Sequence, residues 1–306
     1  MRQRIAPAGT IFWSKRKSLS DGAIASPEAL AARLERELYL SGEELSTASF
    51  LALKLGKPLL LEGMPGVGKT EAAKALASAL GLNLVRLQCY EGIDAGHALY
   101  EWNYARQLLS LRQNTSADLY ADEFLIERPL LKALKAPRET LLLIDEIDRA
   151  DHEFEAFLLE FLSDFQISIP ERGTLKAASP PFVILTSNRT RDLHEALRRR
   201  CVYNWIAYPD AEREARIIML RAPHVAEKTA QAVATAVNGL RHLPLVKAPG
   251  ISEAIDWANA ASLLEKGSGR WPEAFRRSIG VAIKDEEDLT LVRSELDALL
   301  IKACGS

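Results

Sequence analysis

Residues 63–70 carry glycines, a lysine and a threonine at a spacing that can hold phosphate groups. They read Gly-Met-Pro-Gly-Val-Gly-Lys-Thr, the Walker A pattern G-x-x-x-x-G-K-T. Glycines let successive backbone N–H groups curl around phosphate oxygens, and a following helix points its positive end at the same anion. We expect Lys69 to reach the β- and γ-phosphates and the Thr70 hydroxyl to bind Mg²⁺. The candidate nucleotide-binding residues are Gly63, Pro65, Gly66, Val67, Gly68, Lys69, Thr70 and Glu71.

The segments on either side of this loop predict the strand and the helix that the motif requires. An apolar run at 58–61 precedes the loop, and an alanine-rich stretch at 71–80 follows it. A glycine-containing turn can match the pattern by chance, but a chance match rarely has both flanks. The sequence therefore predicts that the chain binds a nucleoside triphosphate.

Residues 141–146, Leu-Leu-Leu-Ile-Asp-Glu, form an apolar run that ends in two carboxylates, which is the Walker B pattern. In open α/β sheets ligands lie at the carboxyl ends of the strands. We expect Asp145 to hold Mg²⁺, and Glu146 to orient and deprotonate the attacking water. The alternative is an acidic turn after a buried strand, and the Walker A loop in the same chain makes this the weaker interpretation.

Two further polar groups follow apolar segments. Residues 182–188 read Phe-Val-Ile-Leu-Thr-Ser-Asn, and the Asn188 amide could hydrogen-bond the γ-phosphate or the water, or else form a plain turn. Three arginines, 198–200, close a short predicted helix. Cations stabilise a helix end without any catalytic role. One of them could instead be an arginine finger for a neighbouring subunit, which contributes roughly 10³–10⁵ in kcat where present.

Composition narrows the class of protein. The chain has 306 residues, of which 48% are hydrophobic and 26% charged, as in ordinary globular proteins. A net charge of −2 and a pI of about 6.3 argue against a strongly basic nucleic-acid-binding surface. The three cysteines are far apart and fit reduced thiols. No apolar run approaches the length of a membrane span or of a signal segment, so we expect a cytoplasmic location.

The chain changes character near residue 209. Before that point, short apolar runs alternate with helical stretches, which predicts a parallel sheet with crossover helices, and 165–178 reads as a β-hairpin. After that point only helical patterns remain. We therefore predict a tail at 1–20, an α/β nucleotide-binding core at 21–209 and an all-helical domain at 210–306. The expected strands are at 58–61, 84–87, 141–144, 182–186 and 202–206.

The order of these motifs resembles that of the AAA+ ATPases. Residues 53–209 are more closely similar to the MoxR family. Within that family, the chain resembles the ATPases that accompany carbon-monoxide-dehydrogenase-type molybdenum enzymes. The MoxR similarity lies in 57–63, 169–174 and 185–193, and the similarity to the molybdenum-enzyme ATPases in 86–92 and 100–104.

The resemblance implies a fold and a role for each matching residue. The fold would be an AAA+ P-loop core, a parallel sheet flanked by helices, with a C-terminal helical lid. Asn188 takes the sensor-1 position, and Arg200 best matches the arginine finger, with Arg199 as the alternative. Gln88, at the end of the second strand, would restrain Glu146.

The resemblance also implies partners and one departure from the family. It implies Mg²⁺-dependent ATP hydrolysis by a hexameric homo-oligomeric ring that acts on a client metalloenzyme, together with a protein bearing a von Willebrand factor A domain. The alternatives are a nucleic-acid motor or loader, and a nucleotide-regulated scaffold. Where the family commonly has a sensor-2 arginine, residues 250–254 carry an acid instead. Either Arg276 or Arg277 substitutes, or the lid senses the nucleotide only weakly.

Overall fold

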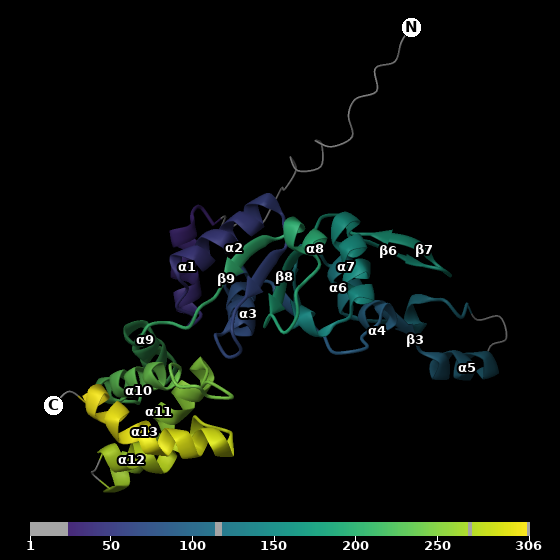
Figure 1. The fold of residues 1–306 in the computed structure, drawn as a ribbon. Coiled ribbons are helices and arrows are strands. Elements are labelled where there is room, and N and C mark those ends of the chain that lie inside the picture. Colours follow the sequence, from purple (N-terminus) through teal and green to yellow (C-terminus); the bar gives the residue numbers. More distant parts are fainter. Residues whose placement is uncertain (1–23, 114–117, 269–270, 305–306) are drawn as a thin grey trace. The chain divides into compact units, whose positions relative to one another are not determined.

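The computed structural model describes residues 24–113, 118–268 and 271–304 of the chain (Figure 1). The tail expected at 1–20 lies outside the described residues. Two compact units divide the chain. Of the described residues, the first unit holds those at 24–37, 41–62 and 73–204, and the second holds those at 38–40, at 63–72 and from 205 onward.

A five-stranded sheet forms the centre of the first unit, and each of the five expected apolar runs supplies one strand. The strand order is β2-β5-β8-β1-β9, and the pairs β2–β5, β5–β8 and β1–β8 are parallel. This order and the flanking helices confirm the predicted α/β fold. The strands are β1 (Leu59–Glu62), β2 (Asn83–Gln88), β5 (Thr140–Asp145), β8 (Phe182–Ser187) and β9 (Val202–Trp205).

The side chains of the central strands are more completely buried than those of the two edge strands. Every residue of β1, β5 and β8 is buried, as expected of strands that are covered on both faces. β2 and β9, in contrast, expose several side chains. Each has a neighbour on one side only, so its apolar run is covered less completely.

Helices that begin at recognisable caps surround this sheet. The Ser26 side chain accepts a hydrogen bond from the Ala29 N–H at the start of α1, and Asp151 caps α7 through the Phe154 N–H. The helices of this part of the chain are α1 (Pro27–Arg36), α2 (Glu43–Leu55), α3 (Lys69–Leu80), α6 (Pro129–Lys135), α7 (His152–Asp164) and α8 (Glu195–Arg200).

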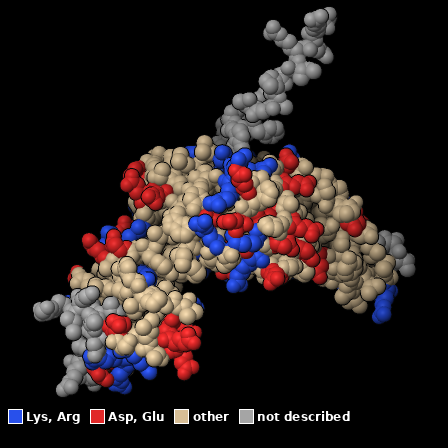
Figure 2. Space-filling model, in the orientation of Figure 1, with Lys and Arg blue, Asp and Glu red and all other residues tan. Residues whose placement is uncertain are grey.

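Charged side chains of both signs mix on the surface. In Figure 2 basic and acidic areas lie next to one another on the face shown. Oppositely charged side chains on the surface also form ion pairs, such as Arg106 with Glu123 and Arg199 with Glu195. This face therefore presents no broad field of a single sign.

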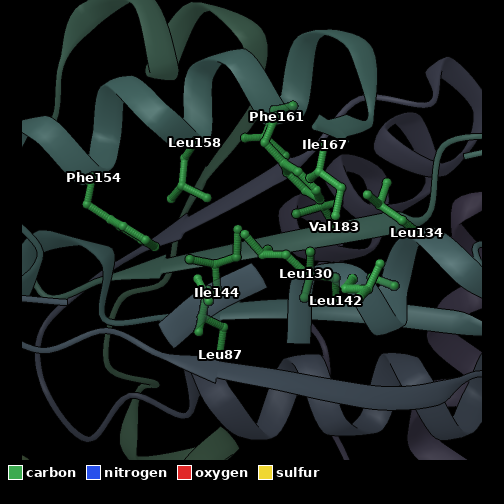
Figure 3. Close-up of a cluster of buried hydrophobic side chains, with 14 of the residues drawn as sticks. Leu87, Leu130, Leu134, Leu142, Ile144, Phe154, Leu158, Phe161, Ile167 and Val183 are labelled. Carbon is green, nitrogen blue, oxygen red and sulfur yellow. The ribbon is translucent and has the colours of Figure 1, made fainter. Parts of the chain in front are cut away.

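The apolar side of α7 packs on the sheet (Figure 3). Phe154, Leu158 and Phe161 recur at helical spacing, are buried, and lie over Leu142 and Ile144 of β5. Burying each such side chain contributes about 1.5–3 kcal/mol. This packing fixes the strand that ends in the two candidate catalytic carboxylates.

Two insertions extend the first unit. One contains α4 (Ala95–Leu99), the antiparallel pair β3 (Tyr100–Trp102) and β4 (Leu125–Glu127), and α5 (Tyr104–Gln113). The other is the hairpin of β6 (Gln166–Ile169) and β7 (Gly173–Lys176). The hairpin turn contacts the first insertion through an ion pair between Arg172 and Asp122.

The aromatic residues of the first insertion do not share one helix. Tyr100 and Trp102 lie on β3, where buried Trp102 contacts Tyr100 and Tyr120 edge-on at ring-centroid distances of 6.1 and 5.3 Å. Tyr104 begins α5 and is 67% exposed. Trp102 therefore serves packing, whereas Tyr104 faces solvent.

The second unit has a helical core. Trp257 is fully buried, contacts Phe275 edge-on at 5.2 Å and donates from Nε1 to the Ser278 hydroxyl at 3.1 Å. Among the described residues no helix is long and apolar enough to cross a membrane. The helices are α9 (Ala211–Arg221), α10 (Glu227–Leu240), α11 (Ile251–Ser268), α12 (Trp271–Ser278) and α13 (Glu286–Cys304).

Candidate nucleotide-binding site

The carboxyl ends of the sheet strands bring several predicted residues to one edge. Glu62, the last residue of β1, pairs in register with Ser187 of β8, and Gln88 of β2 pairs with Asp145 of β5. The Walker A loop begins at the residue after Glu62. The strand order thus brings the end of β1, after which the loop begins in the chain, to the edge where the Walker B strand ends.

The Walker A loop has a conformation that requires glycine. Gly66 and Gly68 have φ angles of +79° and +89°, a region that residues with a Cβ rarely adopt. At Gly63 a Cβ would lie 2.3 Å from the carbonyl oxygen of Ile206, so no larger side chain fits without a shift. Glycines at these positions are what a loop that curls its backbone N–H groups inward needs.

Lys69 folds back over this loop. Its side chain is largely buried, and Nζ donates to the carbonyl oxygens of Gly63 at 2.7 Å and Met64 at 2.9 Å. An ammonium group at the loop and the N-terminus of α3 are together a suitable donor set for phosphate oxygens. Thr70 follows in the first turn of α3, where its hydroxyl can serve as an oxygen ligand for Mg²⁺.

Two residues of the second unit donate hydrogen bonds to backbone carbonyls of this loop. The Tyr208 hydroxyl donates to the Pro65 carbonyl at 2.7 Å, and the Ile251 N–H donates to the Gly66 carbonyl at 2.9 Å. The guanidinium of Arg241 lies over the Tyr208 ring, 4.0 Å from its centroid. Sequence patterns do not reveal these contacts, because Tyr208 and Arg241 belong to no motif.

The segment at the expected sensor-2 position contributes backbone to this contact. The Cα atom of Gly250 lies 2.7 Å from the position that a Cβ would take at Gly66, and the α11 N-terminus follows directly. Arg276 and Arg277, the proposed substitutes, are exposed at the end of α12. Arg276 lies 3.9 Å from Glu273.

Asp145 is the last residue of β5, and both of its carboxylate oxygens accept hydrogen bonds. Its carboxylate is 1% exposed. Oδ1 accepts from the Thr186 hydroxyl at 2.5 Å, and Oδ2 lies 2.9 Å from Arg86 Nε and 2.6 Å from Nη2. Arg86 supplies the positive charge that this buried carboxylate needs.

Glu146 leaves the strand in a different direction. Its φ angle is +56°, an uncommon conformation for a residue with a side chain, and its N–H donates to the Thr186 hydroxyl at 2.9 Å. Oε2 accepts from Gln88 Nε2 at 3.1 Å and lies 3.2 Å from Arg149 Nε. The expected contact between Gln88 and Glu146 is therefore present.

Asp148 organises the segment that carries Asn188, a role that no sequence motif indicates. Its carboxylate accepts from the N–H groups of Asn188 at 3.1 Å and Thr190 at 2.9 Å, and from the Thr190 hydroxyl at 2.7 Å. Burial raises the pKa of Asp148, but these hydrogen bonds outweigh it, so the pKa lies below its usual value. Asn188 is thus held through its backbone N–H, and its side-chain amide takes no part in this contact with Asp148.

The three arginines at the end of α8 have different surroundings. Arg198 turns toward its own sheet, with Nη2 3.4 Å from Glu62 and its guanidinium over the Tyr203 ring. Arg199 pairs with Glu195 on the surface, and Arg200 donates to the Ala196 carbonyl at 3.3 Å. Arg199 and Arg200 therefore remain the two exposed candidates for an arginine finger.

The described cysteines and acids do not form another centre. Burial raises the pKa of the Cys89 and Cys201 thiols to about 12, so both are protonated and unreactive at neutral pH. Among the side chains that the structure describes, no three of His, Cys, Asp or Glu gather as a metal site. The oxygen donors of Thr70 and Asp145 suit Mg²⁺, which takes few protein ligands and relies on substrate phosphates for others.

Comparison with known proteins supports this assignment. Residues 59–205 match the family model "ATPase family associated with various cellular activities (AAA)". This span contains both Walker motifs, Asn188 and the arginines of α8. Residues 59–205 are thus similar to AAA ATPase domains, for which ATP with Mg²⁺ is the fitting ligand.

The curated relatives cover part of the chain. An uncharacterized protein of Staphylococcus epidermidis is 29% identical over 167 residues, which are 52% of this chain and 59% of the relative. One of Staphylococcus aureus is 30% identical over 166 residues, which are 52% of this chain and 58% of the relative. The chain thus spans less than two thirds of the length of these relatives.

Among solved structures, the fold is similar to that of a RuvB protein. The Thermotoga maritima RuvB Holliday junction branch migration motor aligns with a TM-score of 0.50 at 18% identity, over 90% of this chain and 77% of that chain. A RuvB variant gives the same TM-score at 19% identity. At such identities the likeness establishes the fold, which is the AAA+ fold.

Proposed function

We propose that the protein is an Mg²⁺-dependent ATPase of the AAA+ type that remodels a client protein. The observation that carries this proposal is the pair Asp145–Glu146 at the end of β5. One carboxylate is buried and paired, and the other turns away from the strand beside a hydrogen-bonding amide. Two adjacent acids with different surroundings suit metal binding and proton transfer respectively.

Different residues of the chain have different roles in hydrolysis. Mg²⁺ bound with the nucleotide supplies charge neutralisation at the phosphate oxygens. Lys69 and the loop N–H groups hold the phosphates, while Thr70 and Asp145 offer oxygen ligands. Glu146 accepts a proton as the water oxygen bonds to the γ-phosphorus and the bond to the bridging oxygen breaks. Asn188 orients the water or the γ-phosphate.

We further propose that the protein works as a homo-oligomeric ring, most simply a hexamer. Arg200, with Arg199 as the alternative, would reach the nucleotide of the neighbouring subunit. The exposure of both side chains at the end of α8 supports this role, because a finger must leave its own subunit. Arg198 is less suited, since it contacts Glu62 of its own sheet.

The proposed client is a protein, and the MoxR resemblance suggests a metalloenzyme under maturation with a von Willebrand factor A domain partner. The first insertion supports a protein client. On α5, Tyr104, Leu108 and Leu109 are 67%, 63% and 58% exposed, which is unusual for apolar side chains so close together. A molybdenum hydroxylase encoded beside this chain would support this specific client.

A nucleic-acid motor is the second candidate, favoured by the fold shared with RuvB. The mixture of charges on the face in Figure 2 gives it no support. A nucleotide-regulated scaffold is the third, and the presence of Glu146 argues against it.

Phosphate release by the purified, assembled protein distinguishes these functions. We expect Mg²⁺-dependent release that double-stranded DNA, single-stranded DNA and RNA leave unchanged. Stimulation by a nucleic acid would favour the motor. ATP binding without phosphate release in every assembly state would favour the scaffold and contradict the proposed hydrolysis.

A further inference from the structure

Arg86, on the edge strand β2, contacts the buried Walker B carboxylate of Asp145 and the neighbouring Gln88. Its guanidinium contacts Asp145 Oδ2 through Nε at 2.9 Å and Nη2 at 2.6 Å. The same Nη2 donates to Gln88 Oε1, two residues further along the strand. One side chain thus links the metal-binding acid to the amide that contacts Glu146.

This link favours one orientation of the Gln88 amide, and the Cys89 carbonyl, which accepts from Gln88 Nε2 at 3.3 Å, favours the same orientation. A guanidinium can only donate hydrogen bonds, so the amide must present its oxygen to Arg86. Its NH₂ group then faces the opposite way, toward Glu146 Oε2 at 3.1 Å. If the amide rotated by half a turn, N–H would face N–H at Arg86 and oxygen would face oxygen at Glu146.

Thr186 closes the arrangement on the other side. Its hydroxyl donates to Asp145 Oδ1 and accepts from the Glu146 N–H. Asp145 is therefore fixed at both oxygens, and the Glu146 backbone is fixed as well. The Glu146 side chain remains the movable part, and its contacts are the Gln88 amide and Arg149.

We propose that Arg86 is a positioning residue that holds the Gln88 amide in the orientation that restrains Glu146. The proposal rests on the proposed hydrolysis, in which Glu146 accepts a proton from water. An oxygen that accepts a hydrogen bond from the amide is less available for that proton. Arg86 therefore keeps hydrolysis slow until Gln88 or Arg86 moves. Because the Arg86 side chain is 48% exposed on a sheet edge, a client or neighbouring subunit can reach it.

The Arg86→Lys variant separates the two contacts of Arg86. Lysine keeps a positive charge beside Asp145, but its single ammonium lacks the fork that reaches Asp145 and Gln88 together. We expect Arg86→Lys and Gln88→Ala each to raise basal kcat about 2- to 10-fold, the range of one net hydrogen bond, with KM for ATP unchanged. The double variant should gain no more than either single variant, because both remove the same restraint.

Two further measurements complete the experiment. Arg128→Lys is the matched control, since Arg128 also pairs with a carboxylate, Glu101, and is 40% exposed. Its basal kcat should equal that of the wild type. In nucleotide-free protein with ¹⁵N-labelled glutamine, the side-chain amide signal that Gln88→Ala removes should shift in Arg86→Lys and stay in place in Arg128→Lys.

The outcomes separate this proposal from the proposed hydrolysis. An unchanged Gln88 amide signal in Arg86→Lys overturns the proposal, whatever the kinetics. Additive gains in the double variant also overturn it. A wild-type protein that releases no phosphate contradicts the proposed hydrolysis instead, and the amide signal still tests whether Arg86 orients Gln88.

Discussion

Asp145 and Glu146 are neighbours in the chain, yet their surroundings suit opposite tasks. Asp145 is buried and saturated with hydrogen bonds, so it keeps one position. Glu146 is bound through one oxygen to Gln88 and Arg149 and has a left-handed backbone that turns it off the strand. A fixed acid suits a metal, and a restrained but movable acid suits proton transfer.

The Glu146→Gln variant tests the proposed base. Glutamine has nearly the same shape but cannot take a proton, so ATP binding should persist while turnover falls by about 10²–10⁴, the usual contribution of a general base. Glu123→Gln, which changes an exposed acid paired with Arg106, is the control. Steady-state phosphate release and ATP binding are the measurements, and unchanged turnover in Glu146→Gln would refute the role.

The Asp148→Asn variant tests how the segment around Asn188 is held. The folded-state pKa of Asp148 is lowered, so its charge stabilises the protein above the unfolded pKa of about 3.9 and this contribution is lost as the pH falls through the folded-state pKa. We expect a loss of about 1–3 kcal/mol in the free energy of unfolding at pH 7, because an amide N–H would face a backbone N–H.

Denaturant unfolding as a function of pH measures this effect. The difference between wild type and Asp148→Asn should stay constant down to about pH 4 and shrink below it. A difference that disappears by pH 6, where the carboxylate is still charged, would contradict the explanation.

At the scale of elements, α8 presents three arginines in three different settings. The Arg200→Ala variant should lose about 10³-fold or more in kcat if this side chain is the finger, and Arg199→Ala should lose as much if that residue is. Mixing the inactive variant with Lys69→Ala chains should restore part of the activity, because some sites in a mixed ring have both an intact loop and an intact finger. A mixture that stays inactive while both variants assemble would exclude action in trans.

The elements themselves were largely predictable from the sequence. The five apolar runs became the five strands, and for β1, β5 and β8 the reason is full burial, which favours continuous apolar segments. Gly63, Gly66 and Gly68 have the conformations or spacing that the loop motif requires. The edge strands are less buried than the central strands. This could not be predicted, because an apolar run in the sequence does not show which strand has only one neighbour in the sheet. β3 was missed because three residues are too short for periodicity to appear.

The partners of the site residues were not predictable. Thr186 and Asp148 contact residues about 40 positions away, and Tyr208 contacts Pro65 across 143 positions. No local pattern records such pairings, since they depend on the order of strands and on how the helices pack. The two acids and the loop could be identified from their sequence motifs. The groups that orient them could be identified only from the structure.

At the scale of the whole molecule, a buried ion pair supports the helical unit and its contact with the Walker A loop. Arg241 donates through both terminal nitrogens to Glu214 at 2.7 Å, with side chains 6% and 0% exposed. Arg241 also lies over Tyr208, which binds the Pro65 carbonyl. The pair thus couples the stability of the helices to the shape of the loop.

The Arg241→Met variant tests this support. It leaves the Glu214 carboxylate buried without its partner, which should cost about 3–5 kcal/mol in stability. Adding Glu214→Leu should recover much of the loss, because the buried charge is then gone. Thermal unfolding measures both. Arg276→Ala, at the exposed contact with Glu273, should cost at most about 1 kcal/mol, and an equally small loss in Arg241→Met would contradict the account.

Equilibrium binding of ATP in the presence of Mg²⁺ tests the central claim most directly. The wild-type protein should bind ATP, and Lys69→Ala should weaken this binding at least about tenfold, because the ammonium group at the loop is removed. Removing Mg²⁺ with a chelator should weaken wild-type binding as well. If the purified protein with Mg²⁺ shows no affinity for ATP as a monomer or in any assembly, the loop at 63–70 is not a nucleotide site and the account is wrong.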